Sequence, residues 1–259
     1  MLHARPGPFQ RYVAIGDSST EGIDDPDGKG GYLGWSQRLA ERISQAQGGL
    51  DYANLAVRGL TTAEVRLRQL DAALALRPDL ASLFCGTNDV TGMRFDAMRV
   101  ANDIEDMQRA LVAAGATVIG FTLPDLTPLM PLARLIAPRI AALNRALHAA
   151  SQRTGSILVD FAAYPVATDP RLWSEDRIHA NAAGHRRIAE ALAQALRLPG
   201  SNEAWRQPFA APVQLSRRQR WSAEARWIRF HLLPWLGRGM LGRSTAHGRQ
   251  PKRPGLTSI

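Results

Sequence analysis

Five short apolar runs alternate with longer amphipathic stretches between residues 11 and 200, and this alternation restricts the possible folds most strongly. The stretches 33–44, 62–76, 95–114, 132–154 and 183–196 repeat apolar residues at spacings of three and four, which is typical of amphipathic helices. Strands that alternate with helices predict an α/β domain with a parallel sheet covered by helices. The five expected strands are Tyr12–Ile15, Tyr52–Val57, Leu80–Phe84, Thr117–Phe121 and Ile157–Phe161.

Three residues indicate where these helices begin or end. Gly115 and Gly155 follow two helical stretches, at positions that favour a residue tolerant of positive φ. Pro138 lies inside the fourth stretch and predicts a kink or a helix start there.

The chain has 259 residues, and its basic charge is confined to the end. Residues 1–200 hold 21 Lys and Arg against 21 Asp and Glu, whereas residues 201–259 hold 11 basic residues against Glu203 and Glu224. Single cores stop growing near about 250–300 residues, so we expect one domain at 1–200 with an extension at 201–259. The Arg-, Trp- and Pro-rich extension is expected to form one helix at 216–233 and to be disordered at 242–259.

Several classes of protein lack support in the sequence. Cys85 is the only cysteine, and neither C-x-x-C nor H-E-x-x-H is present, so we expect no disulfide, no metal and no cofactor. The turn around Ser18 contains no phosphate-binding loop, and no G-x-S-x-G motif occurs. Residues 1–10 lack the apolar run of a secretory signal, and no run reaches the roughly 18 apolar residues of a membrane span. We therefore expect a cytoplasmic location.

Reactive side chains follow four of the predicted strands directly. In doubly wound sheets the ligand lies outside the carboxyl ends of the strands, so these segments are expected to meet at one edge. The segments are Gly16-Asp17-Ser18-Ser19-Thr20-Glu21-Gly22, Arg58-Gly59, Gly86-Thr87-Asn88-Asp89 and Asp176-Arg177-Ile178-His179.

These segments contain every group that a serine nucleophile needs. Ser18 is the candidate nucleophile, His179 the base that takes its proton, and Asp176 the group that orients the imidazole. The D-x-x-H spacing lets one local turn place Asp176 and His179 relative to each other. The backbone N–H groups of Ser18 and Gly59 and the side-chain amide of Asn88 are candidate donors to an oxyanion.

Other polar residues near the motifs are expected to support the site without reacting. Asp17 is expected to make turn hydrogen bonds, and Gly86 and Asp89 to support the Asn88 loop. Cys85 ends an apolar strand and is interpreted as a small buried hydrophobe. His185 is interpreted as a surface or packing histidine.

On these four blocks the sequence strongly resembles the SGNH hydrolases, also called the GDSL esterases and lipases, over about residues 11–197. The four residues that give the family the name SGNH correspond here to Ser18, Gly59, Asn88 and His179. The resemblance implies a flavodoxin-like three-layer α/β/α fold with a five-stranded parallel sheet in the order 2-1-3-4-5. It also implies a shallow, adaptable site that cleaves esters or thioesters.

Two further segments bear on substrate and partners. The glycine-rich stretch Ile23–Gly34 is expected to flank the site and to act as a lid. In the extension, an apolar stripe at 216–236 combined with arginines is typical of a basic amphipathic helix. Docking on the chain's own domain is the favoured interpretation, with peripheral membrane or protein contact as the alternative. Nucleic acid is not expected as a partner: 30 of the 32 basic residues are Arg, which indicates a composition bias across the whole chain and not a local selection for phosphate contacts. The stripe consists of Trp221, Ala225, Ile228, Leu232 and Trp235.

The sequence therefore predicts a serine hydrolase of the carboxylesterase or lipase type. It would cleave small-molecule carboxylic esters or thioesters through an acyl-enzyme intermediate. One alternative is an acyl or acetyl transferase or a deacetylase that acts on a sugar or lipid. Another is a membrane-surface or partner-binding module whose hydrolase core is vestigial.

Overall fold

A six-stranded sheet forms the centre of the molecule. The computed structural model describes residues 8–92, 95–210, 216–234, 237 and 246–259. The strand order is β5-β4-β3-β1-β2-β6, and the first five strands along the chain are parallel. The predicted order 2-1-3-4-5 is therefore confirmed. The strands are β1 (Arg11–Gly16), β2 (Asp51–Asn54), β3 (Leu80–Phe84), β4 (Thr117–Phe121), β5 (Ile157–Val159) and β6 (Arg253–Ser258).

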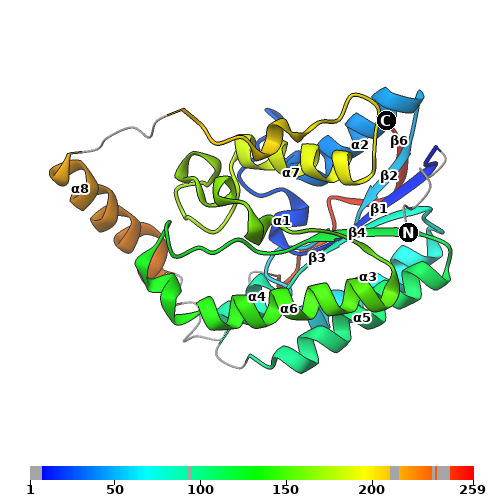
Figure 1. The fold of residues 1–259 in the computed structure, drawn as a ribbon. Helices are drawn as coiled ribbons and strands as arrows, with labels where there is room; N and C mark the ends of the chain where they lie inside the picture. The colour runs from blue at the N-terminus through cyan, green and yellow to red at the C-terminus, as the bar shows by residue number, and fades with distance from the viewer. Residues whose placement is uncertain (1–7, 93–94, 211–215, 235–236, 238–245) are drawn as a thin grey trace.

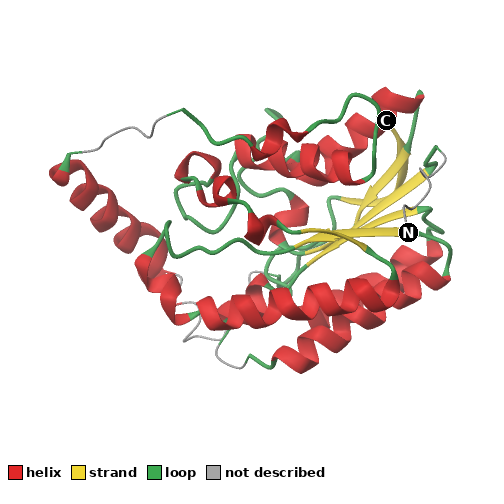
Figure 2. Ribbon diagram, in the orientation of Figure 1, coloured by secondary structure: helices red, strands yellow, loops and turns green. Residues whose placement is uncertain are grey.

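Helices cover both faces of the sheet, which gives the expected three layers (Figures 1 and 2). α2 (Gly34–Gln47) and α7 (Ala182–Ala195) pack together on one face. On the other face lie α3 (Thr62–Ala75), α5 (Ala97–Ala113) and α6 (Ala137–Thr154). The short helices α1 (Ser18–Glu21) and α4 (Thr87–Thr91) begin near the carboxyl ends of β1 and β3. Both faces of the parallel strands are therefore buried.

The residues singled out at the helix ends behave as predicted. Pro138 lies in the first turn of α6, where its missing N–H has no intrahelical partner to lose. Gly155 caps the same helix at φ 75°, and Gly115 follows α5 at φ 91°. In the described part of the chain, five 3-10 segments, η1 to η5, connect the later elements. They are η1 (Pro131–Leu135), η2 (Phe161–Ala163), η3 (Pro165–Thr168), η4 (Pro170–Leu172) and η5 (Glu203–Arg206).

The sixth strand corrects the expectation of five strands and of a disordered end at 242–259. β6 pairs antiparallel with β2, with Asp51 opposite Ser258, and Ile259 N donates to Leu50 O at 3.0 Å. Without β6, β2 would be an edge strand with unpaired backbone groups. The segment RPGLTS contains Pro and Gly and lacks an apolar alternation, so no pattern indicated a strand. Residues 242–245 lie outside the described part of the chain.

The extension also contains the predicted helix. α8 (Arg217–Trp227) begins after the capping residue Ser216 and continues as a π-helical turn, η6 (Ile228–Leu232). Figure 1 shows α8 at the side of the molecule, away from β6. Among the described residues, no helix is long and apolar enough to cross a membrane.

Candidate active site

The turn after β1 places Ser18 at the carboxyl edge of the sheet. A side chain at Gly16 would put its Cβ 2.2 Å from the carbonyl oxygen of Phe84, so only glycine allows this close approach of β1 to β3. Asp17 caps α1 by accepting the N–H of Ser19 at 3.1 Å. Ser18 is the first residue of the helix, and its side chain is half-buried.

The structure brings Ser18, His179 and Asp176 into one hydrogen-bonded chain. Ser18 Oγ lies 2.8 Å from His179 Nε2, and His179 Nδ1 lies 2.5 Å from Asp176 Oδ2. With Nδ1 protonated toward the carboxylate, Nε2 is the nitrogen that accepts the hydroxyl proton. The arrangement can therefore activate Ser18 as a nucleophile.

A tight loop between the bridge residues Trp173 and Ala180 holds the acid and the base in place. Asp176 Oδ1 accepts the N–H groups of Ile178 and His179 at 2.9 and 3.0 Å, and the Ser174 hydroxyl donates to it at 2.7 Å. Arg177, between the two catalytic candidates, has a φ of 64°, which is uncommon for a residue with a Cβ. The D-x-x-H turn is therefore closed by its own hydrogen bonds, as its spacing predicted.

The two members of this turn shift each other's pKa in opposite directions. Burial lowers the pKa of His179, but the hydrogen bond and charge of Asp176 outweigh burial and raise it above its usual value. Burial raises the pKa of Asp176, but the hydrogen bond and charge of His179 outweigh it and hold the pKa well below its usual range. Asp176 is therefore a carboxylate that favours the imidazolium formed when His179 takes a proton.

The three proposed oxyanion donors differ in their surroundings. Among the described residues, the backbone N–H groups of Ser18 and Gly59 have no protein acceptor. Gly59 has a φ of 81°, a conformation that favours glycine. Asn88 Nδ2 donates to Leu60 O at 2.9 Å and lies 3.4 Å from Asp17 Oδ2. The first contact orients the amide, and the second is long enough to yield to a better acceptor.

The supporting aspartates have structural partners, and Asp89 is half-buried. Asp17 is fully buried, and burial raises its pKa to about 7. Asp89 Oδ2 accepts both the N–H and the hydroxyl of Thr62 at 2.9 Å, which ties the Asn88 loop to the start of α3. Burial raises the pKa of Cys85 well above its usual value, so this thiol is a poor nucleophile, in line with its expected packing role.

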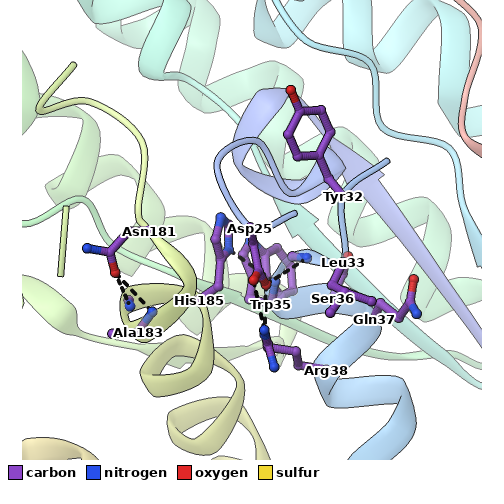
Figure 3. A network of polar contacts seen from close by, with 12 residues as sticks. Asp25, Tyr32, Leu33, Trp35, Ser36, Gln37, Arg38, Asn181, Ala183 and His185 are labelled. Carbon is purple, nitrogen blue, oxygen red and sulfur yellow. Dashed lines mark hydrogen bonds and ion pairs between the residues drawn. The ribbon is translucent and has the colours of Figure 1, made fainter. Parts of the chain in front are cut away.

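The sequence did not indicate the polar network around His185, which Figure 3 shows. His185 is fully buried; its Nδ1 accepts the N–H of Trp35 at 3.1 Å, and its Nε2 lies 2.9 Å from the carbonyl of Ile23. Burial lowers the pKa of His185 to about 4, so it is neutral and its Nε2–H donates to Ile23. His185 is therefore a packing histidine that joins α7 to both ends of the expected lid.

The glycine-rich stretch Ile23–Gly34 is fastened at several points. Asp25 is buried and accepts two hydrogen bonds from Arg38, each of 2.7 Å, together with the N–H of Gly34 at 3.0 Å (Figure 3). Lys252, just before β6, donates to the carbonyls of Tyr32 and Leu33 at 2.8 Å. A lid function stays a prediction, and these contacts restrict movement to the middle of the stretch.

Helix α8 reaches the loop that carries the acid and the base. Trp227 Nε1 donates to the backbone carbonyl of Asp176 at 3.0 Å. Glu224 Oε2 accepts a hydrogen bond from Arg177 Nη1 at 3.0 Å, and Glu224 Oε1 forms an ion pair with Arg177 Nη2 at 2.8 Å. The guanidinium of Arg177 lies 4.8 Å from the Trp227 ring centre. The favoured docking on the chain's own domain is therefore observed.

The docked face of α8 differs from the predicted apolar stripe. Trp221 is 77% exposed and Ile228 is also exposed, whereas Trp227, which lies off the stripe, is buried. The stripe was inferred from spacing alone, and spacing does not show which face meets the protein. Trp235 lies outside the described residues.

A largely apolar pocket opens beside the triad. Its volume is about 820 Å³, part of it open to solvent, and both Ser18 and His179 line it. Most of the other lining residues are aromatic or aliphatic, and they come from the ends of β3 and β4, from the loop after β4, from the 3-10 segments, from the loop that carries His179 and from α7. They include Phe84, Phe121, Leu126, Phe161, Val166 and Trp205.

One group of residues in the described part of the chain brings three possible metal ligands together. Asp24, Asp176 and His179 have donor atoms within 4.8 Å of one another. Both ring nitrogens of His179 are already engaged, by Asp176 and by Ser18. A metal bound there would displace the hydrogen bonds of the triad, so the donor set fits acid–base chemistry better than metal binding.

Comparisons with known proteins agree with this geometry. The GDSL-like lipase/acylhydrolase family matches residues 14–187. The solved structure of TesA is 23% identical, with a TM-score of 0.61, and the match covers 73% of this chain and 98% of that one. The acetylxylan esterase Axe2 from Geobacillus stearothermophilus is 18% identical, with a TM-score of 0.62, and covers 79% and 99%. At these identities the structures establish the fold alone. No curated protein sequence matches.

Proposed function

The chain belongs to the GDSL-like lipase/acylhydrolase family and is a hydrolase acting on esters, and we propose that it works through an acyl-enzyme on Ser18. The observation that carries this proposal is the hydrogen-bonded chain from Ser18 through His179 to Asp176. The N–H groups of Ser18 and Gly59 support it, because they have no acceptor in the part of the chain that the structure describes and are suited to donate to an oxyanion.

The proposed reaction has two half-reactions. Ser18 Oγ attacks the ester carbonyl while its proton passes to His179 Nε2, and the tetrahedral oxyanion accepts hydrogen bonds from Ser18, Gly59 and Asn88. The imidazolium then protonates the leaving alcohol, which departs as the acyl-enzyme forms. In the second half, His179 takes a proton from water, the water attacks the acyl carbonyl, and the free acid and Ser18 are released.

The pocket supports an aliphatic acyl group as the bound half of the substrate. Its lining is dominated by Phe, Leu, Val and Trp, which stabilise hydrocarbon by about 25 cal/mol per Å² of apolar surface removed from water. A sugar in the same place would leave hydroxyl groups without partners. We therefore propose small-molecule esters or thioesters of aliphatic acids as substrates; transfer of the acyl group to another acceptor is the second candidate.

A series of p-nitrophenyl esters from acetate to palmitate tests this function. Wild type is expected to hydrolyse members with several carbons faster than the acetate. Ser18→Ala is expected to lose turnover at every chain length and to keep the wild-type circular-dichroism spectrum. Turnover by Ser18→Ala would contradict the mechanism, and a preference for acetate would contradict the aliphatic substrate. Product analysis with added alcohol separates hydrolysis from transfer.

A further inference from the structure

Four aromatic rings form a row along the pocket, and the row leads away from Ser18. Phe84 ends β3, Phe121 ends β4, Phe161 follows β5, and Trp205 lies in η5 of the extension. Neighbouring ring centres are 3.9, 5.4 and 5.4 Å apart in this order. All four rings line the pocket.

The order of the strands gives the row its direction. Ser18 follows β1, which pairs with β3, and the sheet continues to β4 and then to β5. Adjacent strands lie about 4.8 Å apart, so the three Phe rings, which end or follow β3, β4 and β5, are each about one strand further from the nucleophile. Trp205 packs against Phe161, which follows the edge strand β5, and against α7, so it is the last ring of the row.

The indole of Trp205 is held in a fixed position. Its Nε1 donates to Gln194 Oε1 at 2.6 Å, and its ring meets Tyr164 edge-on at 4.8 Å. The Trp205 carbonyl accepts a hydrogen bond from Arg187 Nη1 at 2.7 Å, which ties η5 to α7. Trp205 is only 5% exposed. These contacts make the indole a wall that does not swing aside freely.

We propose that Trp205 closes the far end of the pocket and sets the longest acyl chain that the enzyme accepts. The inference rests on the proposed function, because it treats the pocket as the acyl site of Ser18. Trp205 lies outside the residues 14–187 that match the family, so the specificity comes from the extension of this chain. The preferred ligands are esters of unbranched aliphatic acids that reach from Ser18 to the indole.

The test compares chain-length profiles of kcat/KM in wild type, Trp205→Ala and Trp205→Phe. Trp221→Ala is the control, because Trp221 belongs to the same extension but is 77% exposed. Each methylene that gains a buried position is expected to improve kcat/KM by about fourfold. Trp205→Ala should therefore move the optimum to longer esters. The ratio of kcat/KM for the longer ester to kcat/KM for the ester that wild type prefers should rise at least tenfold. Trp205→Phe should give a smaller shift, and Trp221→Ala none.

Labelling of Ser18 by a small fluorophosphonate reports whether each variant keeps a folded, reactive triad. A labelled Trp205→Ala with the wild-type optimum would overturn the inference. If Trp205→Ala does not fold, Trp205→Phe decides: an unchanged optimum there overturns it as well. Failure of wild type itself to hydrolyse any ester would contradict the proposed function, which separates that failure from an error about Trp205.

Discussion

The indole N–H of Trp227 donates to the backbone carbonyl of Asp176 at 3.0 Å, although the two residues lie in different parts of the chain. Asp176 belongs to the loop that orients His179, whereas Trp227 ends α8 of the extension. The hydrogen bond joins the extension to the acid of the triad. Together with the Arg177–Glu224 ion pair, this hydrogen bond holds α8 against the loop, in which Arg177 has an uncommon positive φ.

Removing this hydrogen bond is expected to slow catalysis. Trp227→Phe keeps an aromatic ring beside Arg177 and loses the indole N–H together with part of the ring system. A typical hydrogen bond contributes about 0.5–1.5 kcal/mol, so kcat is expected to fall by up to about tenfold, with KM changing less. Steady-state kinetics on the preferred ester measure both constants.

Trp221→Phe is the matched control, because the Trp221 indole is exposed on the same helix. It is expected to keep the wild-type kcat. An unchanged kcat in Trp227→Phe would show that the acid–base loop holds its geometry without this hydrogen bond.

The pKa of His179 is expected to depend on Asp176. Activity requires neutral His179, and Asp176 raises the pKa of the imidazole, so the acid limb of kcat/KM in wild type should lie above about pH 6.5. Asp176→Asn removes the charge and leaves burial, which lowers the pKa of His179. NMR titration of the imidazole should therefore give a pKa above about 6.5 in wild type and below it in Asp176→Asn. Equal values in the two proteins would contradict the electrostatic role of Asp176.

His185 is expected to make stability depend on pH. Its pKa is about 4 in the folded protein and about 6.5 in the unfolded chain, so the unfolded state binds more protons between these values. The stability due to neutral His185 is fully present above about pH 6.5 and is lost as the pH falls toward 4. His185→Gln keeps one acceptor and one donor without titrating.

Urea denaturation of wild type and His185→Gln at several pH values checks this. The free energy of unfolding of wild type should fall more steeply on acidification, by about 1.4 kcal/mol per pH unit between pH 6.5 and 4. The difference between the two proteins removes the contributions of other titrating groups such as Asp17. Parallel curves would mean that His185 does not stay neutral in the folded state.

The sequence was sufficient for those parts of the fold that are marked by local patterns. The strands up to Val159 are apolar because both faces of a parallel sheet are covered, and the residues after them could be assigned to one edge. Ser18, Asp176 and His179 were predictable because a short motif places each at a turn. β6 was not predictable, because an antiparallel edge strand such as Arg253–Ser258 needs no continuous apolar run.

Contacts between residues far apart in the chain also could not be predicted from the sequence. The buried role of His185 depends on Ile23 and Trp35, which are far away in the chain. The roles of Trp205 and Trp227 depend on where the extension packs, and the apolar spacing of α8 indicated a different face. In each case the local sequence shows an aromatic residue but does not show its partner.

The central claim is that Ser18 forms the covalent intermediate, and one measurement tests it most directly. Wild type and Ser18→Ala are incubated with a fluorophosphonate, digested, and analysed by mass spectrometry of the peptides, alongside residual ester turnover. The account predicts one adduct per chain, located on Ser18, with turnover lost in proportion to labelling and no adduct in Ser18→Ala. An adduct on another residue, or turnover that persists in a fully labelled protein, would contradict it.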